Sequence, residues 1–410
     1  MHTNSMNLTA KTLRAGTWLF GHTAIARVGG LIKTIIIARI LTPAQFGVFG
    51  IATLALNLLE TFSETNIDQA LIQRPKLTES DITTAWYIGI VRGFIIGIVL
   101  FLAAPLISQF FREPNAVIYI QMIALAPVIR NFSNPKINLY RRKLDFKKEF
   151  TLKSITTAIE VISGVAFSLW TRSPWGLVAS LIAGAIADVV SSFILMPKLT
   201  ISWPNRASAV SLLRFSGWLW GSSILSYLVN EGDDIVVGKL LGTTQLAFYQ
   251  NAFKVSSLPA TQITGIASQA IYPAFSSIQT DKSRLVRAFK KSLYATIGIT
   301  LMVSLGIILF AQPLTLLILG PQWLAVIPAL KVLTIYGIVR SVATVAGPII
   351  KALDRPDIIT KFAFFRLVVL AICVYPLTQR YGIVGTSWAV VFSTLIPQPY
   401  LIVQMKKLLA

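Results

Sequence analysis

Apolar runs of about twenty residues recur from one end of this 410-residue chain to the other. A helix of that length crosses the roughly 30 Å hydrocarbon core of a bilayer. Charged residues make up 13% of the chain, whereas soluble domains carry about 25%. The sequence therefore predicts a polytopic membrane protein built from helices.

Twelve such runs are present, and the connections between them are too short to hold a globular domain. We expect an all-α fold with twelve transmembrane helices. The expected spans are residues 13–40, 46–68, 82–104, 115–134, 150–171, 175–197, 213–241, 246–273, 291–311, 325–350, 358–379 and 382–404.

The lysines and arginines gather in alternate connections, most densely in "NPKINLYRRKLDFKKEF" (134–150). Cytoplasmic loops carry such an excess, so both termini are predicted to be cytoplasmic. This topology also accounts for much of the net charge of +21. A nucleic-acid partner is not expected, because no soluble domain with a basic, aromatic-interleaved stripe is present. The opposite connections hold only Arg39, Arg112, Arg172, Lys239 and Arg380.

The sequence contains few of the residues and motifs that build metal, disulfide or catalytic sites. One cysteine, Cys373, excludes a disulfide within the chain, and two histidines, His2 and His22, do not make a metal centre. No metal site and no cofactor other than a coupled ion is therefore expected. Phosphate-binding, zinc-protease and nucleophile-elbow motifs are missing from the sequence, which predicts that the protein is not an enzyme. No removable signal peptide is expected, because the N-terminus lacks a short apolar core with a cleavage site.

The two halves of the chain repeat each other at a constant offset of 200 residues. "LRAGTWLFG" (13–21) matches "LRFSGWLWG" (213–221), and "IIARILTPAQFGVF" (36–49) matches "VVGKLLGTTQLAFY" (236–249). Six helices per half is an even number, so both halves insert in the same orientation as parallel repeats. We expect an N-terminal lobe (1–200) and a C-terminal lobe (201–410) around a central cavity.

The segment "ARILTPAQFGVFGIATLALNLLETFSETNIDQALIQRP", followed by "YRRKLDFKK" and later "DRPDIITKF", resembles the polysaccharide transporter branch of the MOP superfamily, which includes Wzx-type flippases. The resemblance implies alternating-access export of a polyprenyl-(pyro)phosphate-linked oligosaccharide across the cytoplasmic (inner) membrane. It also implies membrane lipids and polysaccharide assembly proteins as partners. A lipid II flippase and a cation-coupled multidrug exporter of the same superfamily are the alternatives. A membrane glycosyltransferase or polymerase is disfavoured by the short loops.

Several cations fall inside the predicted spans, where a charge costs about 2.5–3.5 kcal/mol and usually faces a cavity. Arg27 and Lys33 lie on the first span and Arg92 on the third. Lys254 lies on the eighth, which the resemblance places beside the central cavity. We expect these four side chains to bind the anionic substrate, because arginine and lysine pair with phosphate oxygens. The candidates for bonding sugar hydroxyls are Asn57, Tyr227, Asn230, Gln250 and Asn251.

Acidic residues form two further candidate groups. Glu60, Glu64 and Asp68 follow i, i+4, i+8 spacing and would form one polar stripe on a helix. Asp233 and Asp234 occupy the positions equivalent to Lys33 and Thr34 in the other repeat. We expect Glu60, Glu64, Asp233 and Asp234 to couple transport to H⁺ or Na⁺, or to form a gate in which Lys33 pairs with Asp233 or Asp234.

Overall fold

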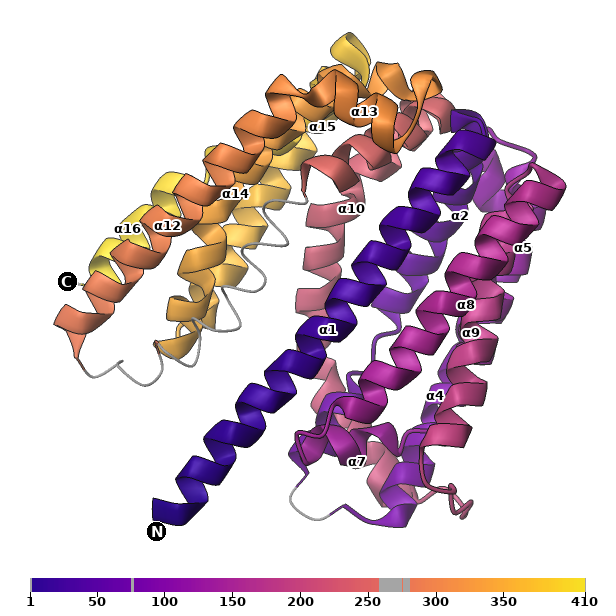
Figure 1. The fold of residues 1–410 in the computed structure, drawn as a ribbon, viewed down its shortest axis with the longest axis vertical. Coiled ribbons are helices and arrows are strands. Elements are labelled where there is room, and N and C mark those ends of the chain that lie inside the picture. The colour runs from indigo at the N-terminus through magenta and orange to yellow at the C-terminus, as the bar shows by residue number, and fades with distance from the viewer. Residues whose placement is uncertain (1, 75–76, 258–274, 276–280, 410) are drawn as a thin grey trace. The chain divides into compact units, whose positions relative to one another are not determined.

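A computed structural model describes residues 2–74, 77–257, 275 and 281–409. All regular secondary structure in this part of the chain is helical, and seven helices are long and apolar enough to cross a membrane. The protein is thus an all-α polytopic membrane protein (Figure 1). The count of twelve spans stays a prediction.

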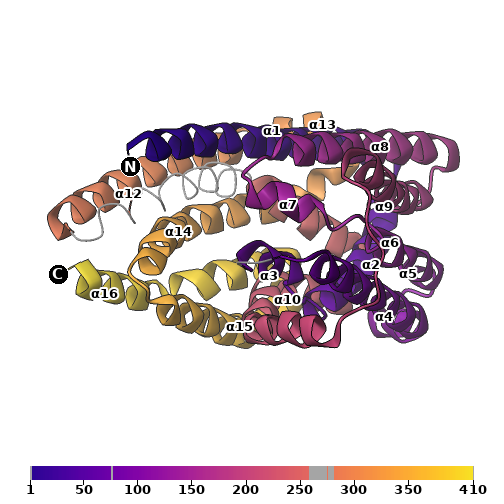
Figure 2. The same cartoon turned by 90° about the horizontal axis from the view of Figure 1, so that it is seen from below.

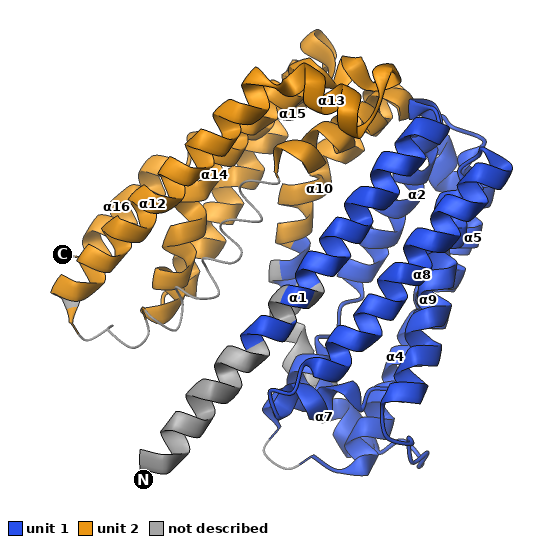
Figure 3. Ribbon diagram, in the orientation of Figure 1, with its two compact units in different colours: residues 1–224 blue, residues 225–410 orange. Residues whose placement is uncertain are grey.

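The chain divides into two compact units, Met1–Ile224 and Leu225–Ala410 (Figure 3). The predicted lobe boundary at 200/201 precedes this division. We describe each unit separately.

The first unit is a bundle in which α8 packs against α9 and α1 packs against α8 (Figures 1 and 2). Ile37 of α1 and Leu41, which directly follows α1, are fully buried and form a core cluster with Leu177 of α9. The helices are α1 (His2–Ile40), α2 (Pro43–Phe62), α3 (Ile67–Gln73), α4 (Glu79–Phe111), α5 (Ala116–Ile123), α6 (Leu125–Arg130), α7 (Ile137–Arg142), α8 (Lys147–Thr171), α9 (Trp175–Leu195) and the first part of α10 (Arg206–Ser256).

Two predicted spans of the first unit are interrupted. The span expected at 46–68 ends at Phe62, and α3 begins after Asn66, whose φ of 47° is left-handed. Asparagine tolerates that conformation better than most residues. The span expected at 115–134 is split at Ala124 into α5 and α6. Pro127 explains this break, because its ring clashes with the carbonyl four residues earlier in a continuous helix.

The second unit contains the rest of α10 and the C-terminal helices. Its core includes Phe275, Ile349 and Leu401, which are all nearly or fully buried. The helices are α12 (Lys282–Leu309), α13 (Ala311–Ile318), the 3-10 helix η1 (Pro321–Val326), α14 (Ile327–Ala352), α15 (Pro356–Leu395) and α16 (Gln398–Leu409).

Two glycines with positive φ break the long helices of this unit. Gly242 in α10 has φ 83°, and Gly382 in α15 has φ 58°. Glycine adopts such conformations without the steric cost that a Cβ imposes. Gly242 falls between the predicted spans 213–241 and 246–273, and Gly382 is the first residue of the predicted span 382–404. Gly242 is also the position equivalent to Thr42, which caps α2 in the first repeat.

Candidate functional site

Lys33 of α1 lies where α1, α8 and α9 meet. Its Nζ donates to Ser180 Oγ at 3.0 Å and lies 3.9 Å from Glu160 Oε2. Ser180 Oγ in turn donates to the Glu160 carbonyl oxygen at 2.6 Å. The close approach depends partly on Gly164, because a Cβ there would crowd Ser180 and the Lys33 stem. In this structure the Lys33 ammonium is held by groups of its own unit. Its pairing with Asp233 or Asp234 stays a prediction.

Arg27 lies on the same helix and is partly exposed. Its side chain makes no hydrogen bond or ion pair with any residue that the structure describes. Its neighbours Ile25 and Val28 are exposed, at 39% and 55%. None of the five N–H donors of the guanidinium is therefore used by a described residue, which leaves them available to a ligand.

Arg92 of α4 caps the end of α2. Its Nη2 donates to the Glu60 carbonyl oxygen at 2.8 Å and its Nε to Ser63 Oγ at 3.2 Å. The carboxylates of Glu60, Glu64 and Asp68 also act on this guanidinium electrostatically. A cation beside a helix C-terminus stabilises the helix end. Arg92 and the predicted acidic stripe therefore lie together, a grouping that the sequence did not predict.

The acidic stripe itself is not one helical face. Because α2 ends at Phe62, Glu64 lies in the turn and Asp68 in the first turn of α3. Asp68 accepts from Asn138 Nδ2 at 2.8 Å and from Arg141 Nη1 at 3.2 Å. The expectation of a continuous stripe was wrong, because the i, i+4 spacing assumed a helix that the chain does not continue.

Arg141 of α7 joins Asp68 to the start of α8. Its Nε and Nη2 donate to the two Glu149 carboxylate oxygens at 3.0 and 2.7 Å. Burial lowers the pKa of Arg141, but the hydrogen bonds and charges of Glu149 and Asp68 outweigh it and raise the pKa overall. This bidentate pair joins α7 to α8 within the basic segment that the sequence predicts to be cytoplasmic.

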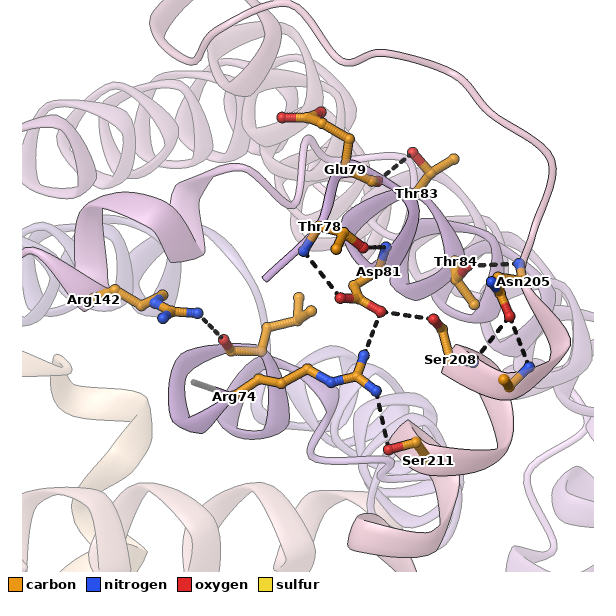
Figure 4. Close-up of polar contacts among 12 residues, drawn as sticks. Arg74, Thr78, Glu79, Asp81, Thr83, Thr84, Arg142, Asn205, Ser208 and Ser211 are labelled. Atoms are coloured by element: carbon orange, nitrogen blue, oxygen red, sulfur yellow. Dashed lines mark hydrogen bonds and ion pairs between the residues drawn. The ribbon is translucent and has the colours of Figure 1, made fainter. Parts of the chain in front are cut away.

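A second polar cluster surrounds Asp81 at the start of α4 (Figure 4). Asp81 is 5% exposed. Its carboxylate pairs with Arg74 and accepts from Ser208 Oγ at 2.7 Å and from the Thr78 N–H at 3.0 Å. The Thr78 hydroxyl oxygen accepts a capping bond from the Asp81 N–H at 3.2 Å. Residues 205–211 comprise Asn205 and the start of α10, and they are held against α4 and Arg74 by the Ser208 bond and by bonds of Asn205 to Thr84 and of Arg74 to Ser211.

The predicted acidic group of the second unit lies on α10, where Asp233 is buried and Asp234 is half-buried. Asp233 is 2% exposed, and its Oδ2 accepts from the Tyr249 hydroxyl. Its Oδ1 is buried without a hydrogen-bond partner among the described residues. Asp234 Oδ2 accepts from Gln250 Nε2 at 3.1 Å. Both carboxylates are thus held across the Gly242 break, because residues 249 and 250 lie on the helix segment that follows it.

Two arginines that the sequence left without a role lie in the same unit. Arg340 and Arg366 both donate to the Tyr336 hydroxyl, at 3.1 and 3.4 Å. The charge of Arg366 also acts on Asp233. The structure therefore adds Tyr249, Tyr336 and Arg366 to this site. For Tyr249 a signal existed, because it replaces Phe49 of the first repeat with a hydroxyl-bearing ring.

The remaining predicted contact residues are spread over α2 and α10. Lys254 is exposed in the last turn of α10. Asn57 is exposed on α2. Asn230 Nδ2 and Asn251 Nδ2 each donate to a carbonyl of their own helix, at 2.7 and 2.9 Å.

Comparison with known proteins decides the family. A model of a family described as polysaccharide biosynthesis protein matches residues 36–328, which is more than half of the chain. The chain belongs to this family. Two of its relatives carry names that concern polysaccharides. The lipopolysaccharide biosynthesis protein WzxC of Escherichia coli is 26% identical over 387 residues, covering 93% of this chain and 78% of that protein. The succinoglycan biosynthesis transport protein ExoT of Rhizobium meliloti is 20% identical, covering 81% and 67%.

Solved structures show the same fold. The lipid II flippase MurJ in an inward closed conformation superposes with a TM-score of 0.77 at 14% identity, covering 94% of this chain and 86% of that one. An inward-facing multidrug resistance MATE transporter of the MOP superfamily gives a TM-score of 0.72 at 15% identity, covering 95% and 98%. This family member therefore has the MOP-type fold that the sequence predicted.

Proposed function

We propose that this protein flips a polyprenyl-(pyro)phosphate-linked oligosaccharide across the cytoplasmic membrane by alternating access. The family match over residues 36–328 carries this proposal. The relatives named for lipopolysaccharide and succinoglycan biosynthesis support a polysaccharide precursor over a drug as cargo. Lipid II is the second candidate cargo, supported by the MurJ-like fold. We place the protein in the inner membrane with both termini in the cytoplasm.

In this mechanism the charged head group enters a low-dielectric space, where fixed cations replace its lost hydration. Arg27 and Lys33 are the candidates on α1. Lys33 is the stronger candidate, because an anion that binds to it would compete with its contact to Glu160 at 3.9 Å. The prenyl tail stays in the lipid, and the protein forms no covalent bond with its cargo. Catalytic residues are therefore not required, and polysaccharide assembly proteins would act before and after transport.

The experiment is translocation of a fluorescent polyprenyl-diphosphate oligosaccharide in proteoliposomes. We compare the wild type with Arg27→Ala and Lys33→Ala, and with Arg380→Ala as a matched control, because Arg380 is an exposed arginine of α15. We expect the wild type and the control to flip the lipid and the two α1 variants to lose at least about tenfold in rate. Full activity in both α1 variants would exclude the cationic site. An inactive wild type that exports cationic drugs would exclude the polysaccharide function.

We further propose that transport is coupled to H⁺ or Na⁺ through the α10 carboxylates. The support is that Asp233 combines near-complete burial with an oxygen that has no hydrogen-bond partner among the described residues. Asp233→Asn keeps the shape of the side chain and removes its charge, so we expect translocation that no longer responds to an imposed ion gradient. A gradient response equal to that of the wild type would assign the energy source elsewhere.

A further inference from the structure

A polar pocket lies inside the first unit, where α3, α4, α6, α7, α8 and α9 meet. Its volume is about 210 Å³, which is room for roughly seven waters at about 30 Å³ each. The pocket volume exceeds the space that an isolated structural water needs and is comparable to the volume of one sugar ring. The predicted topology puts this end of the unit on the cytoplasmic side. None of the cations and acids that we assigned to the cationic site or to ion coupling lines it.

The groups that line the pocket are held in place by hydrogen bonds. Lys153 Nζ donates to Asp188 Oδ1 at 2.7 Å, and Ser133 Oγ donates to Asp188 Oδ2 at 2.9 Å. The Trp86 indole N–H donates to the Phe132 carbonyl oxygen at 3.1 Å, which fixes the ring. The pocket is therefore preorganised, so a ligand would not have to order its walls.

Hydrogen-bonding capacity remains in the pocket after these bonds are made. The Arg130 guanidinium makes no hydrogen bond or ion pair with a residue that the structure describes. Asn131 donates its Nδ2 to the Pro127 carbonyl at 2.7 Å, which leaves its Oδ1 as an acceptor. Lys153 uses one of its three N–H donors on Asp188. Both donors and acceptors are thus available to a ligand.

The charge balance of the pocket selects among ligand classes. Three cations, Arg130, Arg141 and Lys153, line it together with Asp68 and Asp188, and Arg141 is also paired with Glu149. The three cations are matched in number by the carboxylates of Asp68, Asp188 and Glu149, so the total charge is near zero and the pocket lacks the positive excess that a phosphate requires. Sugar hydroxyls both donate and accept hydrogen bonds, and the apolar face of a sugar ring suits an aromatic wall such as Trp86.

We propose that this pocket binds one sugar ring of the cargo, with Trp86 against the ring and Arg130, Asn131, Lys153 and Asp188 bonding its hydroxyls. The statement that this sugar belongs to the cargo rests on the proposed function. The pocket would be a cytoplasmic subsite for the oligosaccharide, separate from the cations that bind its diphosphate.

Saturation-transfer NMR of the full chain in detergent tests the pocket, with glucose, galactose, mannose and N-acetylglucosamine as probes. We expect saturation transfer to at least one of these sugars. We expect Arg130→Gln to bind that sugar roughly tenfold more weakly and to melt at the same temperature, since Arg130 makes no bond to a described residue. The control is Arg287→Gln, an exposed arginine of α12, which we expect to bind as the wild type does.

Three results would overturn the proposal. The first is absence of saturation transfer from all of these sugars. The second is unchanged binding in both Arg130→Gln and Trp86→Ala. The third is displacement of the sugar by inorganic phosphate at equal concentration, which would make the pocket an anion site.

The lipid translocation assay separates this inference from the proposed function. If the wild type flips the glycolipid while sugar binding fails, the pocket assignment falls and the function stands. If sugar binding depends on Arg130 while no glycolipid is flipped, the pocket stands and the function falls.

Discussion

Single side chains connect the helices of the first unit, and Ser180 does so through one hydroxyl group. This fully buried oxygen accepts from Lys33 and donates to the Glu160 backbone. We expect Ser180→Ala to destabilise the protein by about 1–3 kcal/mol, because it leaves buried polar groups unsatisfied. Ser163→Ala is the control, since Ser163 bonds only within its own helix, and should cost less than about 0.5 kcal/mol. Thermal unfolding in detergent measures both, and equal losses would contradict the assignment.

A larger loss of stability is expected when the Asp81 cluster is disrupted. Asp81→Asn leaves the Arg74 guanidinium without its anion and weakens the bond that the Asp81 carboxylate accepts from the Thr78 N–H in the cap of α4. We expect a loss of about 3 kcal/mol, which is typical of breaking a buried charge pair.

Asp357→Asn provides the matched control for that variant. The Asp357 pair with Arg355 joins side chains that are 42% and 50% exposed. Exposed pairs contribute about 0–1 kcal/mol, so the melting temperature should barely change. If the two variants had the same melting temperature, the Asp81–Arg74 pair would contribute no more to stability than a surface pair.

At the scale of elements, the two halves of α15 fold back on each other after Gly382. Thr378 and Thr386 share a hydrogen bond of 2.8 Å between these halves. A Cβ at Gly385 would overlap the carbonyl oxygen of Leu377. We expect Gly385→Ala to cost about 2 kcal/mol or more, because the backbone itself would have to shift.

Gly298→Ala is the control for this helix-packing prediction. Gly298 lies in α12, and a methyl group at this position would meet no described atom within 4 Å. Alanine in an open helical position should stabilise by about 0.5–1 kcal/mol. A lower melting temperature for Gly385→Ala together with a higher one for Gly298→Ala would support the close packing at Gly385. Unchanged melting temperatures in both variants would contradict it.

Helices were predictable from the sequence where their ends are determined by residues close together in the chain. Long apolar runs and breaking glycines are properties of a short window, so the ends near Gly242 and Gly382 were predicted within a few residues. Pro127 was also visible, but its effect on the fourth span was missed. The interruption at Phe62 was not visible, because residues 46–68 carry neither a proline nor a glycine near that point.

The site was less predictable than the helices. Candidate charges could be named because charge inside an apolar run is rare. Their partners could not, since Lys33 meets Ser180 across 147 positions of sequence and Arg92 meets Glu60 across 32. Such pairings depend on how each helix is rotated about its axis, and apolar runs with no polar face leave that rotation open.

For the whole molecule, the distribution of cations predicts which connections face the cytoplasm. Replacing Cys373 with serine removes the only native thiol. In that background, a cysteine at Arg112 should react with a membrane-impermeant maleimide on intact cells. A cysteine at Trp203, which is 92% exposed, should react only after the membrane is permeabilised. The reverse labelling pattern would invert the topology.

The anchoring of residues 205–211 on α4 has a consequence for how the polypeptide can be divided. A gene cut after codon 200 would give a second fragment that begins with a docking peptide for the first, because Asn205 and Ser208 bond to Thr84 and Asp81. Two separately translated fragments would then carry their own means of finding each other in the bilayer. A cut after codon 212 would leave that peptide on the first fragment, and the pair would lose it as a tether.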